Sequence, residues 1–334
     1  MPGTSIDTLD AEYETLREGC GLLDRSERGK LALSGAGAVE FLNGQVTNEL
    51  TTLHPGEGRY AVFLTPKGKM LGDLRILAVG ADRQGPPSEL LLDTERMALQ
   101  ALFDMIRRYK VGYELELHKR TVERGLVSLI GPEAAAVAAG TTDASRLELA
   151  DDEHANATVE VDGIVCLAVR TDTGVDLICD ASDTERLLEA LRARGASPVS
   201  EQAAECLRVE RGRPRYGVDL DDTVIPQEAG LNERAVSFTK GCYVGQETVA
   251  RLFYKGKPNR HLRGLRLSSP AGRGEQLLLG DRVLGSIGSV VDSPRLGPIA
   301  LALVRREAEP GAVVSVGEQG AEAEVVELPF SGEK

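Results

Sequence analysis

The sequence predicts an α+β protein with two lobes, each an antiparallel sheet backed by helices, followed by a small C-terminal β-barrel. A strand-then-helix unit occurs twice, about ninety residues apart, which indicates two related lobes. From His261 onward the chain consists of short alternating segments separated by turn residues, a pattern typical of a small barrel. A chain of 334 residues is long enough for two or three domains with substantial cores.

The first lobe is predicted from hydrophobic periodicity and turn residues. A helix over about 8–20 is closed by Gly21. The segment 65–69 carries Pro and Gly at turn positions and joins two strands as a hairpin. A longer helix over about 94–109 repeats apolar residues at every fourth position, so one of its faces is apolar. Strands are expected at 30–34, 60–64, 71–79, 90–92 and 113–117, with a two-turn helix from residue 38.

The second lobe is predicted because the same unit returns. A strand at 177–179 precedes a helix that opens with Asp183-Thr184-Glu185-Arg186, and the earlier helix opens with Asp93-Thr94-Glu95-Arg96. Asp and Thr are favoured helix caps and Glu suits the first turn, so chance would also produce this match. The shared strand–helix context favours an internal duplication.

The last third of the chain is predicted to leave the lobes and form the barrel. A helix over about 200–211 ends at Gly212. Short strands are expected at 265–267, 276–279, 283–291, 299–304 and 313–316. A turn-rich stretch at 256–259 marks the boundary, so we expect one region over 1–256 and a barrel domain over 257–334.

Composition excludes several classes of protein. The formal net charge of −13 argues against a general nucleic-acid binder, because phosphate contacts need a positive surface, and we expect no direct nucleic-acid binding. No apolar run approaches the ~20 residues that span a bilayer, so no membrane partner is expected. The N-terminus has neither the basic nor the apolar region of a signal peptide, which predicts a cytoplasmic protein.

One basic segment interrupts this acidic composition. Between Glu247 and Glu275 there is no acidic residue, and the segment holds Arg251, Lys255, Lys257, Arg260, Arg263, Arg266 and Arg273. The segment is either a solvated strand face or a local anion site.

Among the cysteines, only Cys242 is a candidate for chemistry. The five cysteines are scattered and form no C-x-x-C pair, which excludes a disulfide framework and disfavours a zinc site. Four of them lie in apolar patterns typical of core residues. Cys242 follows Lys240 by two residues and precedes an expected helix start at Gln246, and both a cation and a helix N-terminus lower a thiol pKa. The alternative is a glycine-rich turn in which the cysteine is merely small.

Three further polar residues are candidates for binding. Asp73 lies in a hairpin strand and Glu210 ends an apolar helix, and a buried carboxylate suits a guanidine-like edge such as that of a pterin. Each acid taken alone also fits a surface or salt-bridged role. Gln227 lies in the loop 224–231, and its side-chain amide can point into a site that this loop covers.

Taken together, these residues resemble a known family. The octet Lys240-Gly241-Cys242-Tyr243-Val244-Gly245-Gln246-Glu247 is similar to the signature of YgfZ-type folate-binding proteins, relatives of the glycine cleavage T-protein (aminomethyltransferase). The segments 40–49, 65–70 and 225–227 also resemble the family. The matches cover most of residues 20–260, and the C-terminal strands fit the family's barrel.

The resemblance implies a three-lobed fold around a central hole that holds tetrahydrofolate or a one-carbon derivative of it. It also implies a role in maintaining iron–sulfur enzymes, including those that modify tRNA, with such enzymes and cluster-assembly proteins as partners. By similarity, Lys240 and Cys242 are the functional pair, and Glu210 matches the T-protein's pterin contact. Asp73 falls where T-proteins carry two adjacent aspartates, and Gly72 replaces the first of them.

Three hypotheses follow. The first is a folate-dependent iron–sulfur maintenance factor with Cys242 as a reactive thiol, the folate ring near Glu210 and Asp73, and its glutamate tail toward Arg251 or Lys255. The second is an aminomethyltransferase of glycine cleavage. The third is a non-catalytic folate sensor that binds a partner. The sequence leaves open whether a reaction is catalysed at all.

Overall fold

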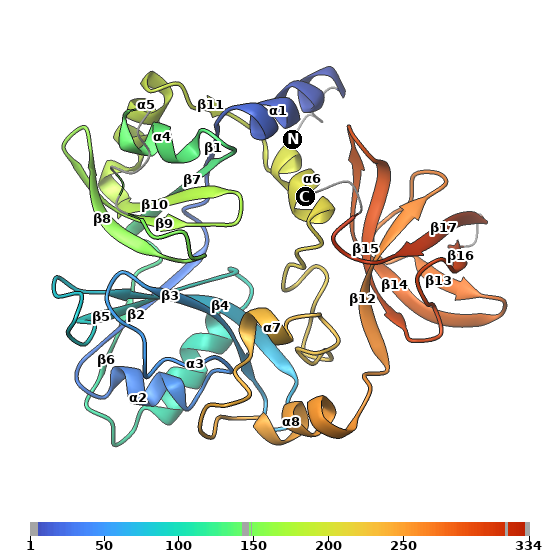
Figure 1. Ribbon diagram of the computed structural model, residues 1–334, viewed down its shortest axis with the longest axis horizontal. Coiled ribbons are helices and arrows are strands. Elements are labelled where there is room, and N and C mark those ends of the chain that lie inside the picture. The colour runs from blue at the N-terminus through green and yellow to red at the C-terminus, as the bar shows by residue number, and fades with distance from the viewer. Residues whose placement is uncertain (1–5, 142–146, 148, 318–319, 331–334) are drawn as a thin grey trace.

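The computed structural model describes residues 6–141, 147, 149–317 and 320–330. Its elements form two sheet-containing lobes and a barrel (Figure 1). This confirms the predicted α+β class with a C-terminal barrel. A central cleft is lined by residues of the two lobes and of the segment 204–234. No helix within the described ranges is long and apolar enough to cross a membrane.

The first lobe is a five-stranded antiparallel sheet with helices beside it. Its strand order is β3-β4-β5-β2-β6. The strands are β2 (Gly29–Ser34), β3 (Gly58–Leu64), β4 (Met70–Val79), β5 (Glu89–Thr94) and β6 (Glu116–Lys119), and the helices are α2 (Ala38–Asn43) and α3 (Leu99–Tyr109).

The second lobe is a six-stranded sheet with the order β11-β1-β7-β10-β9-β8. All of its strand pairs are antiparallel except β1 with β11, so this sheet is mixed rather than purely antiparallel as predicted. The strands are β1 (Gly21–Asp24), β7 (Arg124–Ile130), β8 (Asn156–Val161), β9 (Ile164–Arg170), β10 (Gly174–Asp180) and β11 (Ser197–Pro198), and the helices are α4 (Ala134–Ala139) and α5 (Thr184–Ala193).

The two lobes follow the same chain path, which confirms the structural repeat predicted from the sequence. Each runs strand, helix, three strands, helix, strand, as β2-α2-β3-β4-β5-α3-β6 and as β7-α4-β8-β9-β10-α5-β11. The order of equivalent strands in the two sheets is also the same, apart from the insertion of β1 in the second.

The tetrapeptide that suggested the repeat plays different parts in the two lobes. Asp183 directly precedes α5, as predicted. Asp93 and Thr94 instead complete β5, and α3 begins only at Leu99, so the predicted helix start at residue 94 is wrong. The physical reason is that Arg28 and Arg75 pair with the Asp93 carboxylate and hold it in the sheet.

The sheets pack against each other through a small apolar cluster. Three of the five pairs of equivalent strands each contribute one buried residue per lobe: Ala32 with Leu126, Leu77 with Val169, and Leu91 with Ile178. Beside this cluster, Arg75 of β4 donates to Asp93 of its own sheet and to Asp176 of the other, both at 2.6 Å. An apolar seam and a buried ion bridge therefore join the lobes.

The barrel closes in the order β12-β15-β14-β13-β16-β17. Its strands are β12 (Arg260–Leu267), β13 (Gln276–Leu279), β14 (Arg282–Ser293), β15 (Gly297–Arg305), β16 (Val313–Val316) and β17 (Ala321–Val326). Helix α6 (Glu201–Glu210) packs against α1 (Ile6–Glu18) and against β14 and β15 of the barrel, and the chain then returns through α7 (Asn232–Ala235) and α8 (Gln246–Lys255) (Figure 1). The division at 256/257 stays a prediction.

We predict that the Arg75 bridge is required for stability. Arg75→Met leaves Asp176 buried without the cation that it pairs with and leaves Asp93 with Arg28 alone, and we expect a loss of about 3–5 kcal/mol in the free energy of unfolding. Denaturant titration measures this loss. The matched control is Arg186→Met, because the Arg186 side chain is 63% exposed and pairs with Asp183 at the surface, and we expect a change under about 1 kcal/mol. Equal losses in the two variants would contradict the prediction.

Candidate functional site

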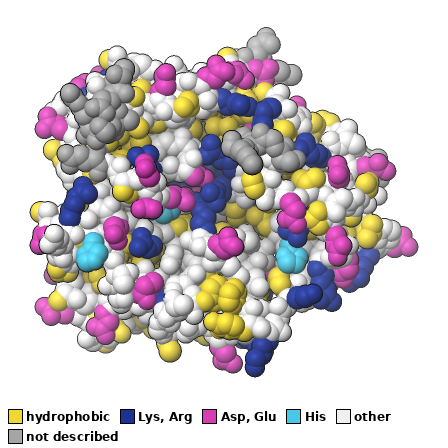
Figure 2. Space-filling view, in the orientation of Figure 1, with side chains coloured by type: hydrophobic (Ala, Val, Ile, Leu, Met, Phe, Trp, Pro, Cys, Tyr) yellow, Lys and Arg dark blue, Asp and Glu magenta, His cyan; other side chains and the backbone are white. Residues whose placement is uncertain are grey.

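The central cleft is rich in arginine. It encloses about 210 Å³ between the two lobes, α6 and the segment after it. Its charged and aromatic lining comprises Arg25, Arg28, Tyr60, Asp73, Arg75, Glu95, Glu153, His154, Asp172, Asp176, Arg208, Arg211, Arg213, Arg215, Tyr216 and Arg234. Eight arginines thus face five carboxylates, and Figure 2 shows basic side chains running along the central hollow. In a chain of net charge −13 this cleft is a local excess of positive charge.

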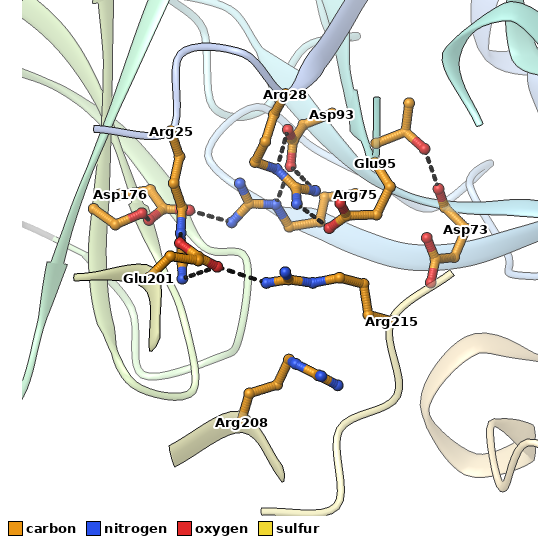
Figure 3. A network of polar contacts seen from close by, with 12 residues as sticks. Arg25, Arg28, Asp73, Arg75, Asp93, Glu95, Asp176, Glu201, Arg208 and Arg215 are labelled. Carbon is orange, nitrogen blue, oxygen red and sulfur yellow. Dashed lines mark hydrogen bonds and ion pairs between the residues drawn. The ribbon is translucent and has the colours of Figure 1, made fainter. Parts of the chain in front are cut away.

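Acidic residues behind the arginines hold them in place (Figure 3). Glu201 at the start of α6 accepts from Arg215 at 2.7 Å and from Arg25 at 3.2 Å. Deeper in the cleft Arg28 pairs with Asp93 at 2.8 Å. Burial opposes ionisation of Asp93, but the charges of Arg28 and Arg75 outweigh it and lower the pKa of this carboxyl. The guanidinium groups are therefore positioned before any ligand arrives.

An outer groove continues from the cleft. It encloses about 730 Å³ and shares Asp172, Arg211 and Arg213 with the cleft. It adds Arg17, Arg170 and Arg295, so five arginines face a single carboxylate there. Such a groove suits an anion with more than one carboxylate or phosphate group.

Asp73 is a carboxyl of the cleft whose proton affinity is strongly shifted. It lies on β4, is 7% exposed, and accepts a 2.6 Å hydrogen bond from the Tyr60 hydroxyl. Burial raises the pKa of Asp73 to about 6, against the opposing effect of the Tyr60 hydrogen bond. At the preceding position a Cβ atom would lie 2.6 Å from the Ala98 side chain and from the Phe63 ring, so Gly72 leaves no room for a second aspartate.

Glu210 does not line the cleft. Its carboxylate is fully buried; the Tyr13 hydroxyl lies 2.9 Å from both oxygens and donates one hydrogen bond that they share, and the Ser293 hydroxyl donates another. It thereby ties α6 to α1 and to β14 of the barrel. Its role as a pterin contact stays a prediction, one that this enclosed geometry does not favour.

Lys240 is tied to the backbone of the first lobe. The residue is 8% exposed, and its ammonium donates to the carbonyls of Asn43 at 2.7 Å, Val46 at 2.9 Å and Asn48 at 2.6 Å. These bonds use all three donors of the ammonium. Burial lowers the pKa of Lys240 to about 8, and the Glu49 charge opposes that shift. In this arrangement Lys240 fixes the turn after α2.

Three other predicted site residues lie outside the central cleft. Cys242 is exposed in the loop before α8, whereas the other four cysteines are buried. Gln227 is half-buried with its amide oxygen unpaired, and Arg251 is exposed on α8. Of the predicted site residues, only Asp73 lines the cleft.

The sequence interpretation missed most of the cleft, although one signal was present. From Arg208 to Arg215, four of eight residues are arginine, which is unusual in an acidic chain. The sequence prediction of an anion site instead rested on the basic segment after Glu247. Tyr60 and His154 carried no sequence signal, because their neighbours in the cleft come from distant parts of the chain.

Comparisons with known proteins agree with this architecture. The family model of the GCVT N-terminal domain matches residues 3–240, and that of the glycine cleavage T-protein C-terminal barrel domain matches residues 260–331. An aminomethyltransferase of Streptomyces avermitilis is 31% identical over 96% of this chain and 88% of its own length. An aminomethyltransferase of Geobacillus kaustophilus is 30% identical over 99% of this chain and 92% of its own length. The crystal structure of glycine cleavage system aminomethyltransferase T from Bartonella henselae superposes with a TM-score of 0.85 at 24% identity, covering 100% of this chain and 92% of that one, and shows the shared fold.

We predict that the buried Asp73 lowers stability near neutral pH. With a folded pKa of about 6 above an unfolded value near 3.9, the folded state binds more protons between these values. Stability therefore falls as pH rises through this window. Asp73→Asn should raise the free energy of unfolding at pH 7 by up to about 3 kcal/mol, with no gain below pH 4. Denaturant titrations at pH 4 and pH 7 measure this difference, and a gain of equal size at both pH values would exclude the titration of Asp73 as its cause.

Proposed function

This chain belongs to the glycine cleavage T-protein family, and we propose that it binds a reduced folate in the central cleft and acts in folate-dependent one-carbon transfer. The observation that carries the proposal is the buried carboxyl of Asp73 in a cleft lined by eight arginines. The relatives above are named aminomethyltransferases, and their sequences align with nearly the whole chain.

The donor set of the cleft fits tetrahydrofolate. The amino-pyrimidine edge of its ring presents N–H donors, which a buried carboxylate such as Asp73 accepts. Its glutamate tail carries carboxylates, which suit the arginines of the outer groove, with Arg211 and Arg213 at the junction. This proposal replaces the tail position predicted near Arg251 and Lys255, because both residues are exposed on α8. When bound, the folate supplies the carrier for a one-carbon unit.

The side chains of the cleft bind, orient and hold protons. The Tyr60 hydroxyl donates to Asp73 Oδ2 and fixes the carboxyl plane. Because the pKa of Asp73 is raised to about 6, this oxygen can hold or release a proton close to neutral pH, as a general acid or base requires. Arg234 lies over the Tyr60 ring, 4.8 Å from its centroid, and pairs with Glu153, so the hydroxyl is itself held in position.

A second candidate function is the folate-dependent maintenance of iron–sulfur enzymes, with those enzymes and cluster-assembly proteins as partners. The observation that favours it is the exposed thiol of Cys242 within the family-like octet. Iron–sulfur clusters usually take four protein ligands, and no group of three His, Cys, Asp or Glu side chains forms a metal site in the described part of the chain. The candidate therefore requires a reactive thiol acting on a partner rather than a resident cluster.

We predict that tetrahydrofolate binds and that Asp73→Asn weakens binding. Loss of a charged hydrogen bond in a buried site costs roughly 1.5–3 kcal/mol, which corresponds to a roughly 10- to 150-fold rise in Kd. Isothermal titration calorimetry measures the change. Asp104→Asn, an exposed acid on α3, is the matched control and should bind like the wild type. Binding by Asp73→Asn with wild-type affinity would remove Asp73 from the site.

The two candidate functions predict opposite roles for Cys242. An aminomethyltransferase forms methylenetetrahydrofolate from an aminomethyl-lipoyl carrier protein, and Cys242→Ser should leave that rate unchanged because the thiol lies outside the cleft. An iron–sulfur maintenance factor should show no such turnover, and Cys242→Ser should fail to complement a strain deficient in iron–sulfur enzyme activity. Turnover and complementation, measured on the same variant, separate the two.

A further inference from the structure

A buried histidine lies where the two lobes meet. His154 precedes β8 and lines both the central cleft and a second cavity of about 440 Å³ beside it. Its side chain is almost entirely enclosed, with the residue 5% exposed. Tyr60 lines the same two cavities, and the two rings lie 6.2 Å apart between centroids.

Neither ring nitrogen of His154 makes a hydrogen bond to any residue that the structure describes. A carboxylate oxygen of Glu153 lies 3.6 Å from Nε2, beyond hydrogen-bonding distance. Buried polar groups are nearly always hydrogen-bonded, and leaving one unpaired is costly. Burial and the Arg75 charge lower the pKa of His154 to about 4, so the neutral ring offers one donor and one acceptor at neutral pH.

The backbone of His154 is in a strained conformation. His154 has a φ of 72°, a left-handed conformation that non-glycine residues rarely adopt. Gly58 of β3 lies against it, and a Cβ there would be 2.4 Å from the His154 carbonyl oxygen. The His154 amide also donates to the Arg170 carbonyl at 2.9 Å. Strained residues that the surrounding structure holds in place cluster at functional sites.

We propose that His154 is a ligand-binding residue of the central cleft, whose ring nitrogens hydrogen-bond to the polar N–H and C=O groups of the bound folate. The inference rests on the proposed function and deepens it, because it adds a neutral donor and acceptor to a cleft otherwise dominated by charges. His154 and Asp73 then contact the ligand from different lobes, with Tyr60 adjoining both.

The test compares two substitutions of similar size. His154→Gln keeps hydrogen-bonding groups and His154→Met removes them, and both carry the same backbone strain. His54→Gln, an exposed histidine, is the matched control. Calorimetry gives the Kd for tetrahydrofolate, thermal melting gives the stability without ligand, and ¹⁵N NMR of the wild-type protein labelled in its histidine rings reports hydrogen bonding at His154. The spectrum of His154→Gln assigns its signals.

We expect tetrahydrofolate to bind His154→Met about tenfold more weakly than wild type, the effect of one buried hydrogen bond. His154→Gln should lose less, and His54→Gln nothing. Without ligand, His154→Met should melt no lower than His154→Gln, because the ring has no hydrogen-bond partner to lose among the described residues. The His154 ring ¹⁵N signals should shift when tetrahydrofolate is added.

Two results would overturn this inference and leave the proposed function standing, provided that the wild-type protein binds tetrahydrofolate. The first is a His154 ring signal that does not shift on binding, and the second is a Kd of His154→Met equal to that of the wild type. A His154→Met variant that melts lower and binds normally would identify a purely structural histidine. No binding by the wild-type protein would overturn the proposed function and this inference together. If His154→Met does not fold, the wild-type ¹⁵N spectrum alone decides.

Discussion

The arrangement of the cleft depends on one buried arginine. Arg75 lies at the junction of the two sheets and binds one carboxylate in each, Asp93 in its own and Asp176 in the other. The planar guanidinium can serve both at once, which a lysine ammonium does less well. Because the same bridge forms part of the cleft wall, the contact that joins the lobes also sets the distance between the groups that face a ligand.

This constraint explains how an acidic protein maintains an electropositive cleft. Most arginines of the cleft pair with a carboxylate, as Arg215 and Arg25 pair with Glu201, whereas Arg211 donates to the Asp172 backbone carbonyl. The pairs reduce the cost of burying charge and leave the arginines correctly oriented. Asp73 forms no ion pair with a described residue, the nitrogen Nε2 of His154 lies 3.6 Å from the Glu153 carboxylate, and burial shifts both groups toward their neutral forms. The cleft therefore combines fixed cations with two groups of adjustable protonation.

The octet around Cys242 and the cleft are separate features of the molecule. Lys240 uses its ammonium to bind three carbonyls of the first lobe, which is a structural task. Cys242 stays exposed beyond it, close to α8. On this helix Phe253 stacks on Phe238 with ring centroids 3.7 Å apart and is itself partly exposed. Any chemistry of the thiol therefore takes place on the outer surface, whatever the cleft binds.

The sequence alone determined the fold class, the barrel, the internal repeat and the wider glycine cleavage T-protein family, because these depend on local periodicity, turn residues and contiguous motifs. It also named Asp73, which the structure places in the lining of the cleft. Only the tertiary structure decided which polar groups face a ligand. Glu210 and Lys240 both find their partners 197 residues away, in Tyr13 and Asn43, and no local pattern encodes such pairings. For the same reason, His154 could be recognised as a candidate ligand-binding residue only from the tertiary structure, because the lack of a hydrogen-bond partner shows only when the described neighbours of the ring are in place.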